Sequence, residues 1–234
     1  VLLHALPIFH IHGLFVAGHL PVMNGSPIIF CEHFHPRQVI LSLPKSTVYM
    51  GVPTNYTRLL SRSELTRWSC RNMRLFISGS APLQAPTFEA FKQRTGHTIV
   101  ERYGMSETGM NTSNPINGKR KAGTVGLALP GIECRIVDDN NDDVGKNSTG
   151  NLQIRGPNVF KGYWNMPDKT ASEFSREGFF LTGDLARKDN ENYISIVGRS
   201  KDLIISGGLN IYPKEIEDVL NQMEGIEESA IIGL

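Results

Sequence analysis

The side chains best suited to chemistry stand in short segments that follow apolar runs. The richest is segment 101–108, which brings two carboxylates, a guanidinium, an aromatic ring and a hydroxyl together after a strand predicted at residues 98–100. Carboxylates can hold Mg²⁺ and an aromatic ring offers a stacking surface, so the segment suits a phosphate-bearing ligand with its metal ion. A solvated loop is the alternative interpretation.

Two further segments have the composition of ligand-binding loops. Segment 77–83 joins an apolar run to a helical pattern through Ser78, Gly79 and Ser80, and such small residues let a planar ligand lie against the backbone. In segment 178–184 a carboxylate, Asp184, follows an apolar run and a glycine, where it could accept both hydroxyls of a ribose. An ordinary tight turn and a cap of the next turn are the respective alternatives.

The last polar segment has the pattern of a joint. Residues 198–202 include three charged side chains, Arg199, Lys201 and Asp202, and residues 205–217 add a loop with two glycines before a helical pattern. A hinge between moving parts and a basic β-turn both fit this composition.

Two histidine pairs have the spacing i, i+2: His10 with His12, and His33 with His35. On a strand each pair would share one face and could bind a metal ion. No cysteine or carboxylate cluster stands near them, so the sequence disfavours a metal site. His10, at the end of an apolar segment, is the most interesting of the four.

Alternating elements must position these segments over the first hundred residues. Strands are predicted at residues 1–7, 27–31, 47–50 and 73–78, and helices at residues 36–43, 53–61 and 84–95. Strands that alternate with helices predict a layered α/β domain with a parallel or mixed sheet.

The pattern changes near residue 123. Strands are predicted at residues 133–138, 150–155, 193–197 and 203–205, with a short helix near residues 167–174 and another from Pro213. We therefore predict three parts: an α/β part over residues 1–122, a β-rich subdomain over residues 123–198, and the start of a small α+β domain over residues 199–234.

Composition excludes several classes of protein. Hydrophobic residues make up 40% and charged residues 20% of the 234 residues, which favours a globular core over disorder. The 24 basic and 23 acidic side chains give a net charge of +1, so no nucleic-acid partner is expected. No apolar run reaches the ~18 residues of a membrane span. Three widely spaced cysteines disfavour a disulfide framework and favour a reducing compartment.

Together the motifs resemble those of the adenylate-forming superfamily, which contains acyl-CoA synthetases, luciferases and peptide-synthetase adenylation domains. Residues 6–10 resemble its acyl-pocket motif, residues 103–108 its YGxTE motif, residues 182–184 its TGD motif, and residues 198–202 with 207–217 its hinge and following loop. Ser106 replaces the threonine of YGxTE and keeps the hydroxyl. Residues 101–115 and 156–164 are similar to bacterial malonyl-CoA synthetases in particular.

The resemblance implies a ligase that joins a carboxylate to ATP, releases pyrophosphate, and then transfers the acyl group from AMP to the thiol of CoA. It implies an adenine pocket lined by Ser80, Ala81 and Pro82, with Tyr103 and Gly104 at the ring, Ser106 near the phosphates and Glu107 holding Mg²⁺. It also implies that Asp184 and Arg199 contact the ribose, that Lys201 is the hinge of a mobile C-terminal domain, and that Gly207 and Gly208 line the CoA channel.

The substrate prediction depends on arginine. A dicarboxylate such as malonate needs a group that holds its second carboxylate, and an arginine can do so with two parallel hydrogen bonds. Arg58 and Arg102 are the candidates, with Ser78, Gly79 and His10 beside them in the acyl pocket. A solvated helix residue is the alternative for Arg58, and a structural ion pair with Glu101 or Glu107 is the alternative for Arg102.

The chain has no initial Met, and an apolar run stands at each end. We therefore expect a central fragment of the enzyme, inactive alone, without the phosphate loop and the late lysine of the superfamily. The alternatives are a synthetase for methylmalonate, another short acid or a fatty acid, and a non-catalytic nucleotide-binding protein. We expect small-molecule substrates, no membrane span and a cytoplasmic location.

Overall fold

The computed structural model describes residues 1–206, 209–223, 225–226 and 229–233. The chain divides into two compact units, Val1–Gly123 and Thr124–Leu234. The division into residues 1–122, 123–198 and 199–234 stays a prediction. Among the described residues, no helix combines the length and the apolar character that a bilayer crossing needs.

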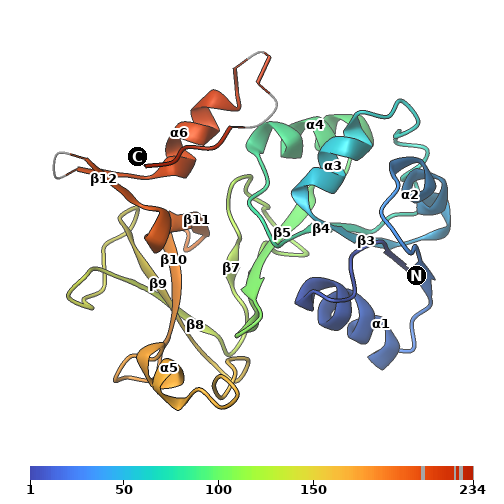
Figure 1. The fold of residues 1–234 in the computed structure, drawn as a ribbon. Coiled ribbons are helices and arrows are strands. Elements are labelled where there is room, and N and C mark those ends of the chain that lie inside the picture. The colour runs from blue at the N-terminus through green and yellow to red at the C-terminus, as the bar shows by residue number, and fades with distance from the viewer. Residues whose placement is uncertain (207–208, 224, 227–228, 234) are drawn as a thin grey trace. The chain divides into compact units, whose positions relative to one another are not determined.

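The first unit is a layered α/β structure (Figure 1). Its elements are β1 (Leu2–His4), the π-helix η1 (His12–His19), α1 (Leu20–Met23), β2 (Ile28–Phe30), α2 (Pro36–Ser42), the 3-10 turn η2 (Leu43–Lys45), β3 (Val48–Gly51), α3 (Pro53–Leu60), β4 (Leu75–Ser78), α4 (Ala85–Thr95), β5 (Ile99–Met105) and β6 (Gly109–Ser113). The strands lie in the order β2-β1-β3-β4-β5-β6. The first five are parallel, and β6 runs antiparallel to β5, so the predicted mixed α/β sheet is confirmed.

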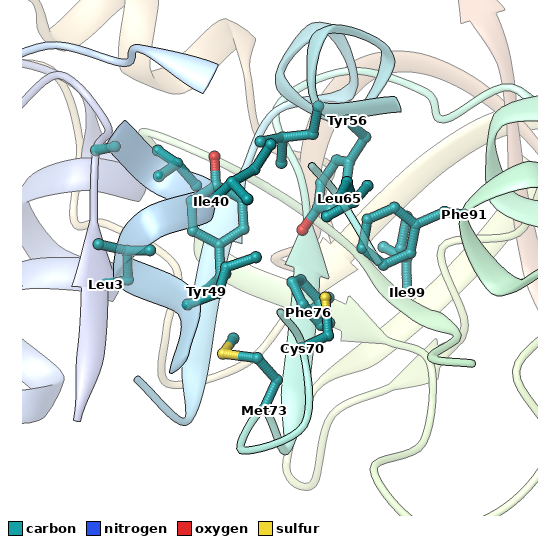
Figure 2. Packing of buried hydrophobic residues seen from close by; sticks show 14 of the residues in the cluster. Leu3, Ile40, Tyr49, Tyr56, Leu65, Cys70, Met73, Phe76, Phe91 and Ile99 are labelled. Atoms are coloured by element: carbon teal, nitrogen blue, oxygen red, sulfur yellow. The ribbon is translucent and has the colours of Figure 1, made fainter. Parts of the chain in front are cut away.

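Side chains alternate across this sheet and fill a core on each face. Tyr49, Phe76 and Ile99 pack with α2, α3 and α4 in the larger core, where the rings of Tyr56 and Phe91 join them (Figure 2). Met50, Ile77 and Val100, one residue along each strand, belong to a second core with Val16 and Ala17 of η1. The helices α2–α4 therefore cover one face of the sheet, and η1 covers the other.

Short-range signals placed most of these elements. Proline at the first position of α2 and of α3 fixes the helical φ without losing a hydrogen bond, and both helices begin where predicted. The π-helix η1 was not predicted. Its hydrogen bonds join residues five apart, and its four apolar residues are consecutive between two glycines, so the sequence lacks the 3.6-residue periodicity of an amphipathic α-helix.

The second unit is mainly antiparallel β-structure. Its elements are β7 (Leu127–Ala128), β8 (Glu133–Val137), β9 (Thr149–Arg155), α5 (Pro167–Ser172), β10 (Phe180–Lys188), β11 (Ile194–Arg199), the 3-10 turn η3 (Ser200–Asp202), β12 (Ile204–Ser206), β13 (Leu209–Ile211) and α6 (Pro213–Leu220). One sheet has the order β11-β10-β9-β8, and β12 pairs with β13. Every one of these pairs is antiparallel.

Two strands are longer than the sequence suggested. We expected the polar cluster to begin after a strand that ends at residue 100, but β5 continues to Met105 because its last four residues pair with β6. Likewise β10 does not end before Asp184 but continues to Lys188 between β9 and β11. Arg102, Tyr103 and Asp184 are therefore held by strands, not by loops.

Candidate active site

The parallel strands of the first unit end side by side. In the sheet register His4 lies opposite Met50, Gly51 opposite Ser78, and Ser78 opposite Glu101. The segments that leave β1 and β4 at this edge carry His12 and Ser80, while β5 runs past the edge and carries Arg102. The carboxyl edge of a parallel sheet is where α/β proteins bind their ligands.

His12 is the centre of a small polar group at this edge. It is buried at the start of η1, and a hydrogen bond of 3.2 Å joins its Nδ1 to Ser80 Oγ. Gly79 lies beside it, because a Cβ on Gly79 would be 3.4 Å from His12 Cε1 and 3.6 Å from the carbonyl oxygen of Arg102. The structure thus brings the predicted residues Gly79, Ser80 and Arg102 together around a histidine that the resemblance had not assigned.

The positive charge of Arg102 opposes the protonation of His12. Burial, the Arg102 guanidinium and His4 lower the pKa of His12 from its ordinary 6.5 to about 4, so His12 is neutral at pH 7. Burial also lowers the pKa of Arg102. The Nε of Arg102 is buried without a hydrogen-bond partner, and the side chain has no ion pair among the residues that the structure describes. The predicted alternative, a structural ion pair of Arg102 with Glu101 or Glu107, is therefore absent from the described part of the chain.

The backbone at Ser80 is unusual. Its φ is 70°, in the left-handed region that a residue with a Cβ adopts at a cost of ~1 kcal/mol or more. The turn brings the Ser80 hydroxyl to His12. Ala81 and Pro82 follow it and are exposed, whereas Ser78 is buried and its Oγ has no hydrogen-bond partner in the described part of the chain.

His4 fixes the start of η1. Its Nδ1 accepts a hydrogen bond from the backbone N–H of Leu6 (3.3 Å), so the proton is on Nε2, which donates to the carbonyl oxygen of Gly13 (2.8 Å). Gly13 is the neighbour of His12 in the chain. Sequence reasoning did not name His4 and considered His12 only as half of a metal-binding pair, because the contacts of both depend on a π-helix that has no periodic signal.

The residues after Arg102 form a tight connection between β5 and β6. Tyr103 and Gly104 are half-buried in β5, and the Tyr103 hydroxyl donates to Met105 Sδ (3.9 Å). Ser106 is exposed and Glu107 is half-buried in the turn between Met105 and Gly109. A carboxylate beside hydroxyl oxygens is a donor set that Mg²⁺ accepts, so these residues fit the predicted metal.

Two predicted residues lie elsewhere. Arg58 is exposed on α3, with its guanidinium carbon 5.1 Å from the centre of the Phe34 ring. His10 is exposed, and its ring lies 4.6 Å from that of Phe9. His10 and His12 do not share a strand, since His12 begins η1, and no group of three metal-ligating side chains is found among the described residues. The substrate roles of Arg58 and His10 stay predictions.

The two residues of the second unit that were predicted to contact the ribose form an ion pair. Asp184 is buried in β10, opposite Arg199 of β11, and Arg199 Nε lies 2.8 Å from Asp184 Oδ1. Lys201 is exposed in η3, two residues after Arg199. The predicted CoA-channel residues Gly207 and Gly208 lie outside the described residues.

The fold and the motifs are those expected for the adenylate-forming superfamily, and comparison with known families agrees. Residues 1–164 match the family described as AMP-binding enzyme, and the chain belongs to that family.

Particular relatives are similar over nearly the whole chain. The malonate–CoA ligase of Arabidopsis thaliana is 38% identical over 99% of the chain and 41% of its own length. The crystal structure of ATP-bound MatB from Rhodopseudomonas palustris matches with a TM-score of 0.98 and 51% identity, over 100% of this chain and 46% of that one. A long-chain-fatty-acid–CoA ligase of Bacillus subtilis is 35% identical over 98% of the chain and 41% of its length. The chain thus spans less than half the length of these relatives.

Proposed function

We propose that the chain is part of an AMP-forming acyl-CoA ligase that activates malonate, or the closely related methylmalonate. The observation that supports this most directly is Arg102. A guanidinium group whose Nε is buried without a partner is costly, because the desolvation of the charge is not repaid. A substrate carboxylate would supply the missing anion and could accept two parallel hydrogen bonds.

The neutral His12 fits the same ligand. A protonated His12 would be repelled by the permanently charged Arg102, so His12 stays neutral without a bound anion. A neutral His12 can donate one ring N–H or accept one hydrogen bond. A site with one charged and one neutral polar group suits an acid that carries one carboxylate beyond the one that reacts. The apolar end of a fatty acid would leave the Arg102 charge uncompensated.

The proposed reaction has two steps, and both balance without an added oxidant. An oxygen of one malonate carboxylate attacks the α-phosphorus of ATP, the bond from that phosphorus to the pyrophosphate oxygen breaks, and pyrophosphate leaves. The deprotonated thiol sulfur of CoA then attacks the acyl carbon, and AMP leaves with the electrons of the broken C–O bond. Arg102 would hold the carboxylate that does not react.

The nucleotide roles follow the motifs, each within its own unit. We assign the adenine to the turn of Ser80, Ala81 and Pro82 and to the ring of Tyr103, and the ribose hydroxyls to Asp184 with Arg199. Glu107, with the Ser106 hydroxyl nearby, would hold Mg²⁺. That ion would neutralise charge on the phosphates as the first step proceeds.

We further propose that residues 199–234 are the hinge and the start of a mobile C-terminal domain, with Lys201 at the hinge. Its position directly after the last strand of the four-stranded sheet supports this. The test is to place one spectroscopic label before Lys201 and one after it, and to measure the distance between the labels with ATP and then with AMP plus CoA. Equal distances in the two states would contradict a hinge.

We place the protein in the cytoplasm. The three cysteines are unpaired and buried, which suits a reducing compartment. Subcellular fractionation of the whole protein with a C-terminal tag tests the assignment, and enrichment in an organelle would contradict it.

The central experiment measures pyrophosphate release by the whole protein with ATP, Mg²⁺ and CoA on malonate, methylmalonate, acetate and octanoate. Arg102→Met should lower kcat/KM on malonate by about 100- to 1000-fold, the cost of losing a buried charge-assisted pair. Arg71→Met is the matched control, because Arg71 is exposed over the Trp68 ring.

Each outcome is informative. Turnover on both dicarboxylates that Arg102→Met abolishes supports the proposal. Turnover on acetate or octanoate instead would make the protein a synthetase of another acid, and binding of ATP without turnover would make it a nucleotide-binding protein. Arg58→Met and His10→Ala, run in the same assay, test the substrate roles predicted for these two residues.

A further inference from the structure

The strand that carries Asp184 is irregular at that residue. Along β10, Leu181 lies opposite Gln153 of β9, but the next paired residue is Leu185, opposite Asn151. Thr182, Gly183 and Asp184 therefore face the single residue Leu152. Such a bulge interrupts the ladder of hydrogen bonds and turns the side chains that follow it.

One side chain replaces the missing ladder. The Thr182 hydroxyl donates to the carbonyl oxygen of Leu152 (2.7 Å) and accepts the backbone N–H of Asp184 (3.1 Å). Thr182 is 5% exposed, so neither backbone group can easily be served by solvent instead. The hydroxyl thereby ties Asp184 to the neighbouring strand across the bulge.

Gly183 provides the backbone angle that the bulge needs. Its φ of 71° is in the left-handed region, and a Cβ built there would meet nothing within 4 Å. Its requirement is therefore the backbone angle itself, not space. On the other side of β10, Arg199 holds Asp184 Oδ1 at 2.8 Å. The Asp184 backbone and its carboxylate are thus fixed by different residues.

We propose that Thr182 is a positioning residue that sets the place of the Asp184 carboxylate for the ribose hydroxyls, through the two hydrogen bonds of its own hydroxyl. This inference rests on the proposed function, which assigns Asp184 to the ribose. Thr182 itself touches no substrate in this proposal. A residue with the same shape and no hydroxyl should keep the sheet but misplace the carboxylate.

The test compares the binding of ATP with that of 2′,3′-dideoxy-ATP, which lacks both ribose hydroxyls, by calorimetry on the whole protein. The unaltered protein should prefer ATP by about 10- to 100-fold, the worth of one or two hydrogen bonds to a carboxylate. Thr182→Val should lose at least about fivefold of that preference, and Thr182→Ser should keep it, because serine retains the donor and the acceptor. A general loss of stability would weaken the binding of both nucleotides alike, so it would not change the preference for ATP.

A matched control exists in the first unit. Thr95 is 3% exposed, and its hydroxyl donates to the carbonyl oxygen of Phe91 (2.7 Å) and accepts the backbone N–H of His97 (3.1 Å), the same pattern at the end of α4. Thr95→Val should lower the melting temperature and leave the ATP preference unchanged. Should Thr182→Val not fold, Thr182→Cys, with its weak donor and acceptor, should show an intermediate preference.

Asp184→Asn distinguishes a failure of the positioning role of Thr182 from a failure of the ribose assignment of Asp184. If it abolishes the preference while folded Thr182→Val keeps it, the positioning role is wrong and the ribose assignment stands. If Asp184→Asn itself keeps the preference, the ribose assignment is wrong. A loss of preference in Thr95→Val equal to that in Thr182→Val would also overturn the positioning role.

Discussion

Arg102 in the first unit and Asp184 in the second are both largely removed from water, but the protein compensates only one of these charges. Asp184 has Arg199 at 2.8 Å in the next strand. Arg102 has no ion pair among the described residues, and its charge is one of the causes that lower the pKa of His12.

The difference matches the ligands that we propose. A ribose is uncharged, so a site for it should already be electrically balanced, and the hydroxyls then replace water at a carboxylate that keeps its partner. A carboxylate substrate brings its own charge, so the site for it can be left unbalanced and is completed by the ligand. The contrast predicts consequences for the protein without ligand that can be measured by unfolding experiments, without an activity assay.

The largest concerns pH. Because the pKa of His12 falls from 6.5 to about 4 on folding, the unfolded chain binds more protons than the folded one between these values. Stability should therefore be complete above pH 6.5 and fall as the pH drops towards 4, by up to about 3 kcal/mol in all. Urea unfolding from pH 4 to 7.5, with His12→Gln as reference, measures this difference.

The same unfolding experiment can test whether the Arg102 charge causes the pH dependence. Since the Arg102 charge contributes to the lowered pKa of His12, Arg102→Met should reduce the pH dependence, and saturating malonate should do so as well. A His12→Gln protein with the full pH dependence of the unaltered one would show that other groups cause it.

The second consequence concerns the sign of a stability change. Arg102→Met removes a charge without a partner, so it should raise the free energy of unfolding without ligand by about 1 to 2 kcal/mol. Asp184→Asn breaks a pair and should lower it, by about 1 kcal/mol because Arg199 can turn to solvent. Thermal and urea unfolding, with Arg71→Met as the exposed control, measure both. Equal losses in the two variants would erase the contrast between the sites.

The regular part of the fold could be predicted because its signals are local. Apolar runs, prolines at helix starts and turn-rich stretches placed α2, α3 and α4 and most strands to within a few residues. The continuation of β5 past Val100 could not be found this way, because β6 supplies the pairing and residues 101–105 do not continue the apolar run. The same holds for β10 beyond Gly183.

The site was predictable in its chemistry more than in its geometry. The motifs singled out Gly79, Ser80, Arg102 and Asp184, which the structure places in two polar groups. They favoured His10 over His12 because the apolar segment before His10 was visible and the π-helix was not. Thr182 belonged to a motif, but its role depends on a strand register that only the folded sheet defines.

The smallest effect tests whether the strain at Ser80 belongs to the unbalanced site. Ser80→Ala keeps the left-handed φ of 70° and loses the hydrogen bond to His12, whereas Ser80→Gly loses the same bond but adopts that φ freely. We expect Ser80→Gly to be more stable than Ser80→Ala by about 1 kcal/mol, and the unaltered protein to be the best binder of malonate of the three. Unfolding curves and calorimetry check the two expectations. Two variants of equal stability would mean that the turn costs the chain nothing, and then the approach of the Ser80 hydroxyl to His12 would need no explanation from function.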